Sequence, residues 1–226
     1  MNMDLAVIFD MDGVLIDSQP LHYEIDIQVL KTVGYTADLA TVAQYTGMSN
    51  PDRWPKYKEN LGLKESAETL IDLCEATVRE VFGEAKLEPI KDIPALLGGI
   101  KAMGLPCGVA SSSSHELIQL VLNQTGIGQF FDFIVSGEDV KAGKPEPEIY
   151  LVAAEKAGRE PGKCIAVEDA PAGILAAKNA GFTCIAFNNP NTMGQDFTHA
   201  DYIVRKFDEC FPIIQTLMYR GLGGKA

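Results

Sequence analysis

Runs of consecutive apolar residues recur along this chain without the apolar–polar alternation of a half-exposed strand. Such runs are typical of strands buried on both faces of a parallel sheet. Helical patterns, with apolar residues three and four positions apart, separate the runs, and the connections are short. The predicted strands are residues 5–9, 106–110, 131–135, 164–167 and 184–187, with a short edge strand at 202–204.

The segments between the later strands carry the end signals of helices. Gly158 and Gly181 each follow an Ala-rich segment, at the position where a left-handed residue commonly ends a helix. Pro171 suits the first position of a helix. Strands and helices thus alternate, which predicts an α/β core with a doubly wound, Rossmann-like parallel sheet. The predicted helices here are residues 114–124, 146–157 and 171–180.

The interval between the first two strands breaks this alternation, because it contains no convincing strand. We therefore predict a small all-helical cap domain, residues 18–86, inserted after the first strand. The core domain would then consist of residues 1–17 and 87–226. Within the insert, helical patterns cover residues 21–33, 37–45 and 67–82, and residues 46–60, TGMSNPDRWPKYKEN, are interpreted as a polar, irregular stretch.

The composition indicates a folded protein with little attraction for polyanions. Of the 226 residues 46% are hydrophobic, and the formal net charge is −12. Neither nucleic acid nor an anionic membrane surface attracts such a chain, so neither is expected as a partner. No apolar run approaches the roughly 20 residues that span a bilayer. The first five residues are interpreted as the start of a strand instead of a signal peptide, and the expected protein is a cytoplasmic monomer.

The remaining bulk signals are weak. The five cysteines are scattered, without metal-binding or disulfide spacing, and are predicted to be reduced core thiols. The glycine-rich end, residues 221–226, is expected to fray. Neither feature points to a function.

Polar residues follow the predicted strands at the points where the strands end. In an open α/β sheet, ligands bind outside the carboxyl ends of the strands, near the point where the strand order reverses. Four carboxylates, several hydroxyls and one lysine are therefore expected at one edge of the sheet. In chain order, these residues are Asp10 and Asp12, the serines Ser111, Ser112, Ser113 and Ser114, Lys144, and Glu168 and Asp169, and the fifth strand is followed by Asn188 and Asn189.

Each of these stretches has a plainer interpretation when it is taken alone. DMDG can be a turn at a strand end, and SSSS can be a loop with a helix N-cap. KPEP can be a turn leading into a helix, and EDAP can be a helix start with acidic residues near the dipole. Four independent turns and caps do not readily explain four such stretches at the ends of parallel strands. We therefore predict one composite site.

The residue types at this edge suit phosphoryl transfer. Asp10 and Asp12 are two residues apart in extended backbone, so both can face one ligand. One can attack phosphorus to form an aspartyl-phosphate, and the other can move protons. Clustered carboxylates repel each other and a phosphate, so a hard cation, Mg²⁺ above all, is expected as cofactor. Ser111 can donate to a phosphate oxygen, Lys144 can stabilise developing negative charge, and Gly13 allows close backbone approach.

Together these stretches resemble the haloacid dehalogenase superfamily of phosphotransferases, and the resemblance covers essentially the whole chain. FDMDGVLIDS, GKPEPEIY and VEDAPAGILAAKNAG are especially similar to the helical-cap subgroup that contains β-phosphoglucomutase and many small-metabolite phosphatases. The resemblance implies that Asp10 is the nucleophile and Asp12 the general acid/base. It also implies that Ser111 and Lys144 hold the phosphate. The implied magnesium ligands are Asp10, the Asp12 backbone carbonyl and Asp169, with Glu168 close by or bound through water.

Two functions remain open within this subgroup, phosphomonoester hydrolysis and the phosphomutase reaction. His22 stands where mutase-like members have a histidine that pairs with the acid/base aspartate, although a lone histidine is more often a surface or packing residue. Asn50 stands where those enzymes have the arginine that grips a distal phosphate, and a neutral amide cannot replace a guanidinium. Arg53 could substitute if the segment starts a helix, or it could be a solvated surface charge. Trp54 and Tyr57 could line the substrate face of the cap or pack its core.

We therefore predict a phosphatase acting on a small phosphorylated metabolite such as a sugar phosphate, with a β-phosphoglucomutase-like enzyme as the alternative. The expected catalytic residues are Asp10, Asp12, His22 and Lys144, and the expected substrate- and phosphate-binding residues are Gly13, Arg53, Ser111, Ser112 and Lys144. The expected metal-binding residues are Asp10, Asp12, Glu168 and Asp169.

Other classes fit less well. A dehalogenase uses an aspartate without a metal, which leaves Asp12, Glu168 and Asp169 without a purpose. A phosphonate-cleaving enzyme needs a cap lysine as a Schiff base, and no cap lysine has an evident buried context. An idle binding module would be expected to lack the nucleophile or the acid/base, and this sequence has both.

Overall fold

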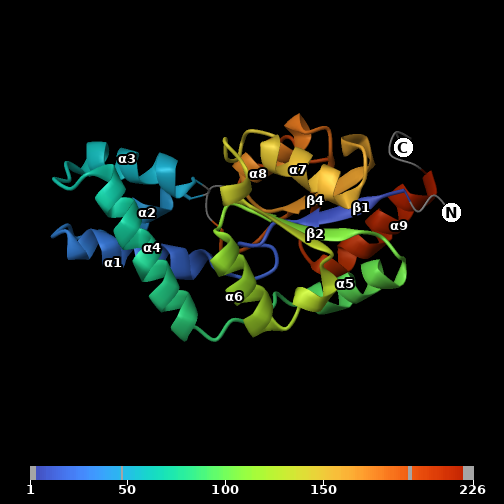
Figure 1. Cartoon of the computed structure of the whole chain (residues 1–226), viewed down its shortest axis with the longest axis horizontal. Coiled ribbons are helices and arrows are strands. Elements are labelled where there is room, and N and C mark those ends of the chain that lie inside the picture. Colours follow the sequence, from blue (N-terminus) through green and yellow to red (C-terminus); the bar gives the residue numbers. More distant parts are fainter. Residues whose placement is uncertain (1–3, 47, 193–194, 221–226) are drawn as a thin grey trace.

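A parallel sheet forms the centre of the larger part of the molecule in this computed structural model, which describes residues 4–46, 48–192 and 195–220 (Figure 1). The strand order is β3-β2-β1-β4-β5-β6, so the chain winds to one side of β1 and then to the other. This confirms the predicted doubly wound α/β core. The strands are β1 (Ala6–Phe9), β2 (Cys107–Ser111), β3 (Phe133–Ser136), β4 (Cys164–Glu168), β5 (Thr183–Phe187) and β6 (Tyr202–Val204).

Helices cover both faces of the sheet, so its central strands are buried on both sides. In β1, Val7 and Phe9 join the hydrophobic core shared with α5, α6 and α9, whereas Ala6 and Ile8 join the core shared with α7 and α8. This is why the β1 sequence is apolar throughout. The core helices are α5 (Ile93–Ala102), α6 (His115–Thr125), α7 (Glu148–Ala157), α8 (Pro171–Asn179) and α9 (Cys210–Arg220).

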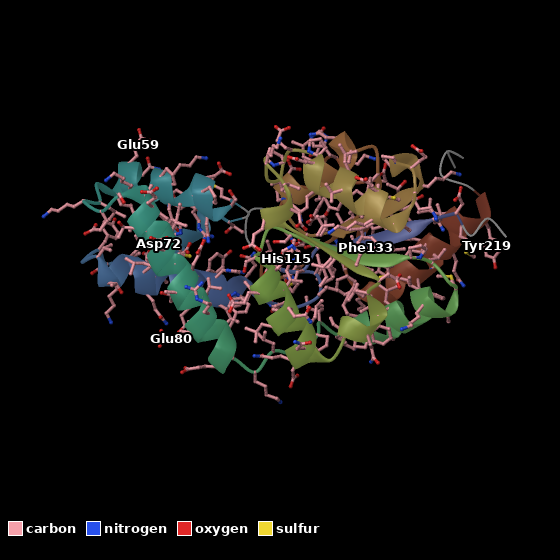
Figure 2. The ribbon with its side chains drawn as sticks, viewed as in Figure 1. Glu59, Asp72, Glu80, His115, Phe133 and Tyr219 are labelled. Carbon is pink, nitrogen blue, oxygen red and sulfur yellow. The ribbon has the colours of Figure 1, made fainter. Side chains whose placement is uncertain are left out.

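Among the described residues between β1 and α5, four further helices form, and they extend to the left of the sheet in Figure 1. Helices α1 and α3 both pack against α4, and the outer surface carries exposed acidic side chains such as Glu59, Asp72 and Glu80 (Figure 2). We call this segment the cap; its assignment as a separate domain, residues 18–86, remains a prediction. The cap helices are α1 (Gln19–Thr32), α2 (Leu39–Ala43), α3 (Asn50–Leu61) and α4 (Ala67–Glu84).

The prediction of an irregular stretch at residues 46–60 is wrong, because most of it forms α3. Pro51 lies in the first turn, where its missing N–H costs nothing, and Gly62 ends the helix in the left-handed conformation. Trp54 and Tyr57 are three residues apart on one face and are both fully buried. Burial of these two aromatic rings stabilises the helix. The charged residues and prolines of the segment made its helical pattern hard to recognise in the sequence. Both rings therefore pack in the core of the cap.

The Trp54→Ala variant is expected to lower the free energy of unfolding by about 3–5 kcal/mol, because it leaves a large cavity in the cap. The measurement is a urea unfolding curve followed by circular dichroism. The matched control is Leu39→Ala, because Leu39 is 51% exposed; its effect should stay within about 0.5 kcal/mol. Equal effects of the two substitutions would contradict the buried position of Trp54.

Two other sequence predictions concern bulk properties. All five cysteines are free and buried, as predicted. Among the described helices, none is both long and apolar enough to cross a membrane. The predicted strand start at residues 1–3 and the predicted frayed end at residues 221–226 lie outside the described ranges. The monomeric state and the cytoplasmic location remain predictions.

Candidate active site

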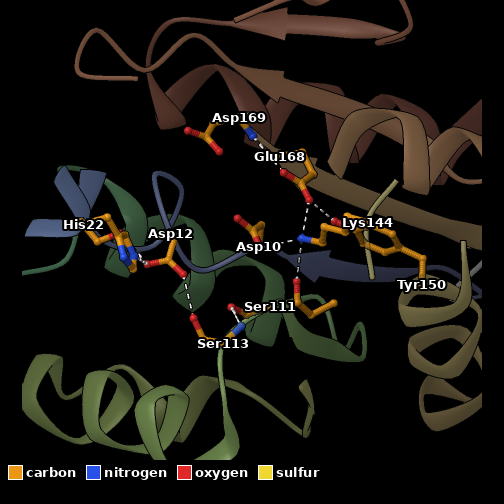
Figure 3. Close-up of polar contacts among 11 residues, drawn as sticks. Asp10, Asp12, His22, Ser111, Ser113, Lys144, Tyr150, Glu168 and Asp169 are labelled. Carbon is orange, nitrogen blue, oxygen red and sulfur yellow. Dashed lines mark hydrogen bonds and ion pairs between the residues drawn. The ribbon is translucent and has the colours of Figure 1, made fainter. Parts of the chain in front are cut away.

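Asp10 lies directly after β1, at the point where the strand order reverses. Its backbone N–H donates to the carbonyl of Val167 in β4 at 3.0 Å, which brings its side chain beside the end of that strand. Glu168 is the last residue of β4, and Asp169 follows it. Oxygens of the three carboxylates Asp10, Glu168 and Asp169 lie within 4.8 Å of one another, and all three residues are buried (Figure 3). Three of the four carboxylates predicted for this edge of the sheet therefore form one cluster, and the fourth, Asp12, is not part of it.

Lys144 reaches this cluster from the loop before α7. Its Nζ donates to Oδ1 of Asp10 at 2.7 Å, to Oε1 of Glu168 at 2.6 Å and to the carbonyl of Ala110 at 3.1 Å. The hydroxyl of Tyr150 donates to the same Glu168 oxygen at 2.6 Å. Burial opposes the charge of Lys144, but the two carboxylates hold its pKa above the usual value. Lys144 is therefore a charged ammonium group within the cluster.

One lysine does not compensate three buried carboxylates. Burial, followed by repulsion from Glu168, raises the pKa of Asp10 well above its usual range. The same two causes raise the pKa of Asp169 to about 7. A hard divalent cation prefers oxygen ligands and would offset this repulsion, so the donor set of Asp10, Glu168 and Asp169 fits such an ion.

Asp12 occupies a different environment, on the cap side of the cluster. Its Oδ1 accepts from Ser18 Oγ at 2.6 Å and lies 2.9 Å from His22 Nε2, while Ser113 Oγ donates to its Oδ2 at 3.1 Å (Figure 3). Burial alone would raise the pKa of Asp12, but His22 and the hydroxyl donors lower it to about 2. The histidine contact expected from the resemblance is thus present, and it holds Asp12 in the ionised form.

The two aspartates share one cavity, although their neighbours differ. Both Asp10 and Asp12 line it, whereas Met11 between them is fully buried. Both aspartates therefore face the same cavity, as their spacing of two residues in extended backbone predicts. The cavity has a volume of about 1240 Å³ and lies between the core and the cap. Its walls include Ser112, Lys144 and Glu168 from the core, and Gln19, His22, Tyr45, Asn50 and Arg53 from the cap.

The serine run has several structural roles. Ser111 ends β2, is fully buried and accepts a hydrogen bond from the N–H of Ser113 at 3.1 Å. Ser112 and Ser113 line the cavity. Ser114 caps α6 by accepting from the N–H of Leu117. The serine run therefore caps a helix, as its plainer interpretation predicts, and it also forms part of the cavity wall.

Gly13 is required by the acidic cluster. Its φ of +78° is strained for residues with a side chain, and a Cβ atom there would lie 2.1 Å from Oδ2 of Asp169. The close backbone approach predicted for Gly13 is thus an approach to Asp169.

Arg53 lies in the first turn of α3. The sequence predicted that Arg53 could take the place of the missing arginine if this segment starts a helix, and the segment does start a helix. Its Nη2 donates to Oδ1 of Asn50 at 2.6 Å and lies 3.3 Å from the carboxylate of Asp26. Arg53 lines the cavity, but its side chain is only 11% exposed. Its charge is therefore compensated within the cap by Asp26.

Three polar residues that contact the carboxylates of the site were not among the catalytic, substrate-binding or metal-binding residues predicted from the sequence. Ser113 donates to Asp12, Tyr150 donates to Glu168, and Thr192 donates to Asp169. The positions of Ser113 and Tyr150 offered a signal, since they lie within the stretches SSSS and GKPEPEIY. Thr192 lies in a loop after β5 and has no such signal.

Comparison with known proteins agrees with this geometry. The family model described as haloacid dehalogenase-like hydrolase matches residues 7–187. The phosphorylated carbohydrates phosphatase of Thermotoga maritima is 34% identical over 178 residues, which make up 78% of this chain and 81% of that protein. Hexitol phosphatase B of Escherichia coli (strain K12) is 30% identical over 204 residues, with 82% of this chain and 84% of that protein covered.

A solved structure shows the same similarity in three dimensions. The crystal structure of β-phosphoglucomutase from Clostridium difficile has a TM-score of 0.81 and 27% identity, and covers 95% of this chain and 96% of that chain. The resemblance stated from the sequence motifs is confirmed, and so is the prediction of a phosphatase-type enzyme. The extent of the match establishes that this chain belongs to the haloacid dehalogenase-like hydrolase family.

Proposed function

We propose that this enzyme is a magnesium-dependent phosphatase that hydrolyses monoesters of a small phosphorylated metabolite, such as a sugar phosphate. The observation that carries the proposal is the contrast between two aspartates that line one cavity. Asp10 contacts Lys144 within the acidic cluster, whereas Asp12 is hydrogen-bonded to His22 and two serines. Such a pair supplies a nucleophile and a separate proton carrier.

In the first step, a carboxylate oxygen of Asp10 forms a bond to phosphorus while the bond from phosphorus to the alcohol oxygen breaks. Asp12 gives a proton to the departing alkoxide. The negative charge of a bound phosphate ester favours the protonated form of Asp12, which this step needs. Lys144, whose Nζ lies 2.7 Å from Asp10, stabilises the charge that develops on the phosphate oxygens.

In the second step, Asp12 takes a proton from a water molecule whose oxygen attacks phosphorus. The bond from phosphorus to Asp10 breaks, so inorganic phosphate leaves and both aspartates return to their starting forms. Asp10, Glu168 and Asp169 would hold Mg²⁺, with the backbone carbonyl of Asp12 as a further ligand. When bound, the ion neutralises the carboxylates and the phosphate oxygens. Ser111, Ser112 and Gly13 are proposed to lie against the phosphate.

The compensated charge of Arg53 favours hydrolysis over the mutase reaction. A mutase must hold a second phosphate in the cap, and the guanidinium of Arg53 is already paired with Asp26. Asn50, which stands where mutase-like members have the arginine, carries no charge and accepts a hydrogen bond from Arg53. The names of the two phosphatase relatives give further support.

A β-phosphoglucomutase-like activity is the second candidate. The 2.9 Å contact between His22 and Asp12 favours it, because mutase-like members pair a histidine with the acid/base aspartate. The similarity to the solved β-phosphoglucomutase points the same way.

A phosphate-release assay with Mg²⁺ over phosphorylated sugars, polyols, nucleotides and small acids separates the two candidates. In parallel, β-glucose 1-phosphate is supplied with a glucose 1,6-bisphosphate primer, and glucose 6-phosphate is measured. We expect phosphate release from a few members of the panel. Formation of glucose 6-phosphate with little free phosphate would instead establish the mutase, and no turnover in either assay would contradict both.

The His22→Ala variant is expected to lower kcat by about 10–100-fold, because a hydrogen bond to a charged group is worth about 1.5–3 kcal/mol. The measurement is kcat on the best substrate of the panel, with the melting temperature as a check on folding. The matched control is His199→Ala, because His199 is exposed in the core part of the chain. A kcat equal to that of the unmodified enzyme would show that His22 does not assist Asp12.

A further inference from the structure

The segment that follows β5 passes beside the acidic cluster and carries buried polar side chains. Asn189 is 2% exposed and Thr192 is 7% exposed. Buried polar groups need hydrogen-bond partners, so the partners of these two side chains indicate what the segment does. Neither residue lies in a stretch that carries the family resemblance.

Both side chains contact residues of the acidic cluster or its support. Thr192 Oγ1 donates to Oδ2 of Asp169 at 2.7 Å, and the backbone N–H of Thr192 donates to the carbonyl of Asn189 at 3.2 Å. Asn189 Nδ2 donates to the carbonyl of Gly13 at 3.0 Å. The segment thus ties the side chain of Asp169 to the backbone just after Asp12.

The same Asp169 oxygen is confined from the opposite direction. Oδ2 lies 2.1 Å from the point that a Cβ atom of Gly13 would occupy, so it packs closely against the Gly13 backbone. With Oδ2 held by the Thr192 hydroxyl and packed against Gly13, rotation of the carboxylate is restricted. The orientation of Asp169 relative to Asp10 and Glu168 is therefore set before any ligand binds.

The restricted rotation of Asp169 opposes the electrostatic repulsion among the three carboxylates. Three buried carboxylates with oxygens within 4.8 Å repel one another, and Lys144 bonds only to Asp10 and Glu168 among them. Without a fixed donor, Asp169 would lower the repulsion by turning away from Glu168. A hydroxyl donor at Oδ2 removes that freedom, which is the function of groups that orient the ligands of metal sites.

We propose that Thr192 is a positioning residue for divalent-cation binding, which it supports by holding Asp169 in the orientation that faces Asp10 and Glu168. Asn189 supports Thr192 through the backbone and anchors the segment to Gly13. The inference rests on the metal site of the proposed function and adds to it a residue that touches neither the ion nor the substrate.

The test is a calorimetric titration of Mg²⁺ into the metal-free protein without substrate. The Thr192→Val variant keeps the shape of the side chain and removes the hydroxyl, so its Kd for Mg²⁺ should rise about 10–100-fold. Thr192→Ser keeps the hydroxyl and should stay within about threefold of the unmodified protein. The matched control is Thr125→Val, which removes a threonine hydroxyl that bonds the Val121 carbonyl within α6; its Kd should not change.

The outcomes separate this inference from the proposed function. If the unmodified protein binds no Mg²⁺, the metal site itself is wrong. If it binds Mg²⁺ and Thr192→Val binds equally well, or Thr192→Ser loses as much affinity as Thr192→Val, the inference about Thr192 is overturned. Thr192→Ala repeats the test should the valine variant fail to fold, and melting temperatures of the metal-free proteins report on folding.

Discussion

The Asp10→Asn variant is expected to lose phosphate release by a factor on the order of 10⁴ or more, because an amide cannot form the covalent bond to phosphorus. The variant should nevertheless fold. The pKa of Asp10 is raised well above its usual range, which means that burial and Glu168 disfavour its charged form in the metal-free protein. A neutral amide of the same shape removes that unfavourable charge, and Lys144 keeps its contact with Glu168.

The measurement is phosphate release at saturating Mg²⁺ and substrate, together with the melting temperature of the metal-free protein. The matched control is Asp72→Asn, because Asp72 is exposed on α4 in the cap (Figure 2) and is not part of the acidic cluster. The control should keep full activity. Turnover by Asp10→Asn at more than a few per cent of the unmodified rate would remove Asp10 from the role of nucleophile.

Removal of Mg²⁺ with a chelator is expected to abolish phosphate release, and added Mg²⁺ should restore it. Without the ion, a phosphate ester would approach buried carboxylates that are balanced by the single charge of Lys144. Like charges at such distances in a poorly solvated site repel strongly. The cation should also raise the melting temperature, because a ligand that binds only the folded protein stabilises it.

The measurement is the rate of phosphate release against free Mg²⁺, with the melting temperature followed in the same series. Chelator mixed beforehand with an equal amount of Mg²⁺ is the control and should have no effect. Full activity in excess chelator would rule out the proposed mechanism, and an unchanged melting temperature in saturating Mg²⁺ would argue against a cation at Asp10, Glu168 and Asp169.

The strands and the acidic edge of the sheet could be predicted from the sequence because their signals are local. A strand buried on both faces is apolar throughout, and polar residues begin where it ends, as at Phe9 and Asp10. Since parallel strands end at the same edge, the sequence positions of Asp10 and Glu168 were enough to bring them together. In the structure, Lys144 connects the two carboxylates, because its Nζ lies 2.7 Å from an oxygen of Asp10 and 2.6 Å from an oxygen of Glu168.

The cap was less predictable, because its helices depend on contacts with each other. The segment forming α3 has two prolines and several charges, and burial of Trp54 and Tyr57 against neighbouring helices stabilises it as a helix. Arg53 pairs with Asp26 on α1, so its charge is compensated within the cap. No local pattern in the sequence connects the two residues.

The fold class, the family and the acidic residues proposed for the site could all be predicted from the amino-acid sequence, since each depends on periodicity or on short motifs along the chain. The differences in environment between these carboxylates arise from tertiary contacts. Ser113 contacts Asp12 from 101 positions away, and Thr192 reaches Asp169 from a loop after another strand. These hydrogen bonds orient the carboxylates, and they form only when distant segments of the chain meet. A pattern along the sequence does not encode such contacts.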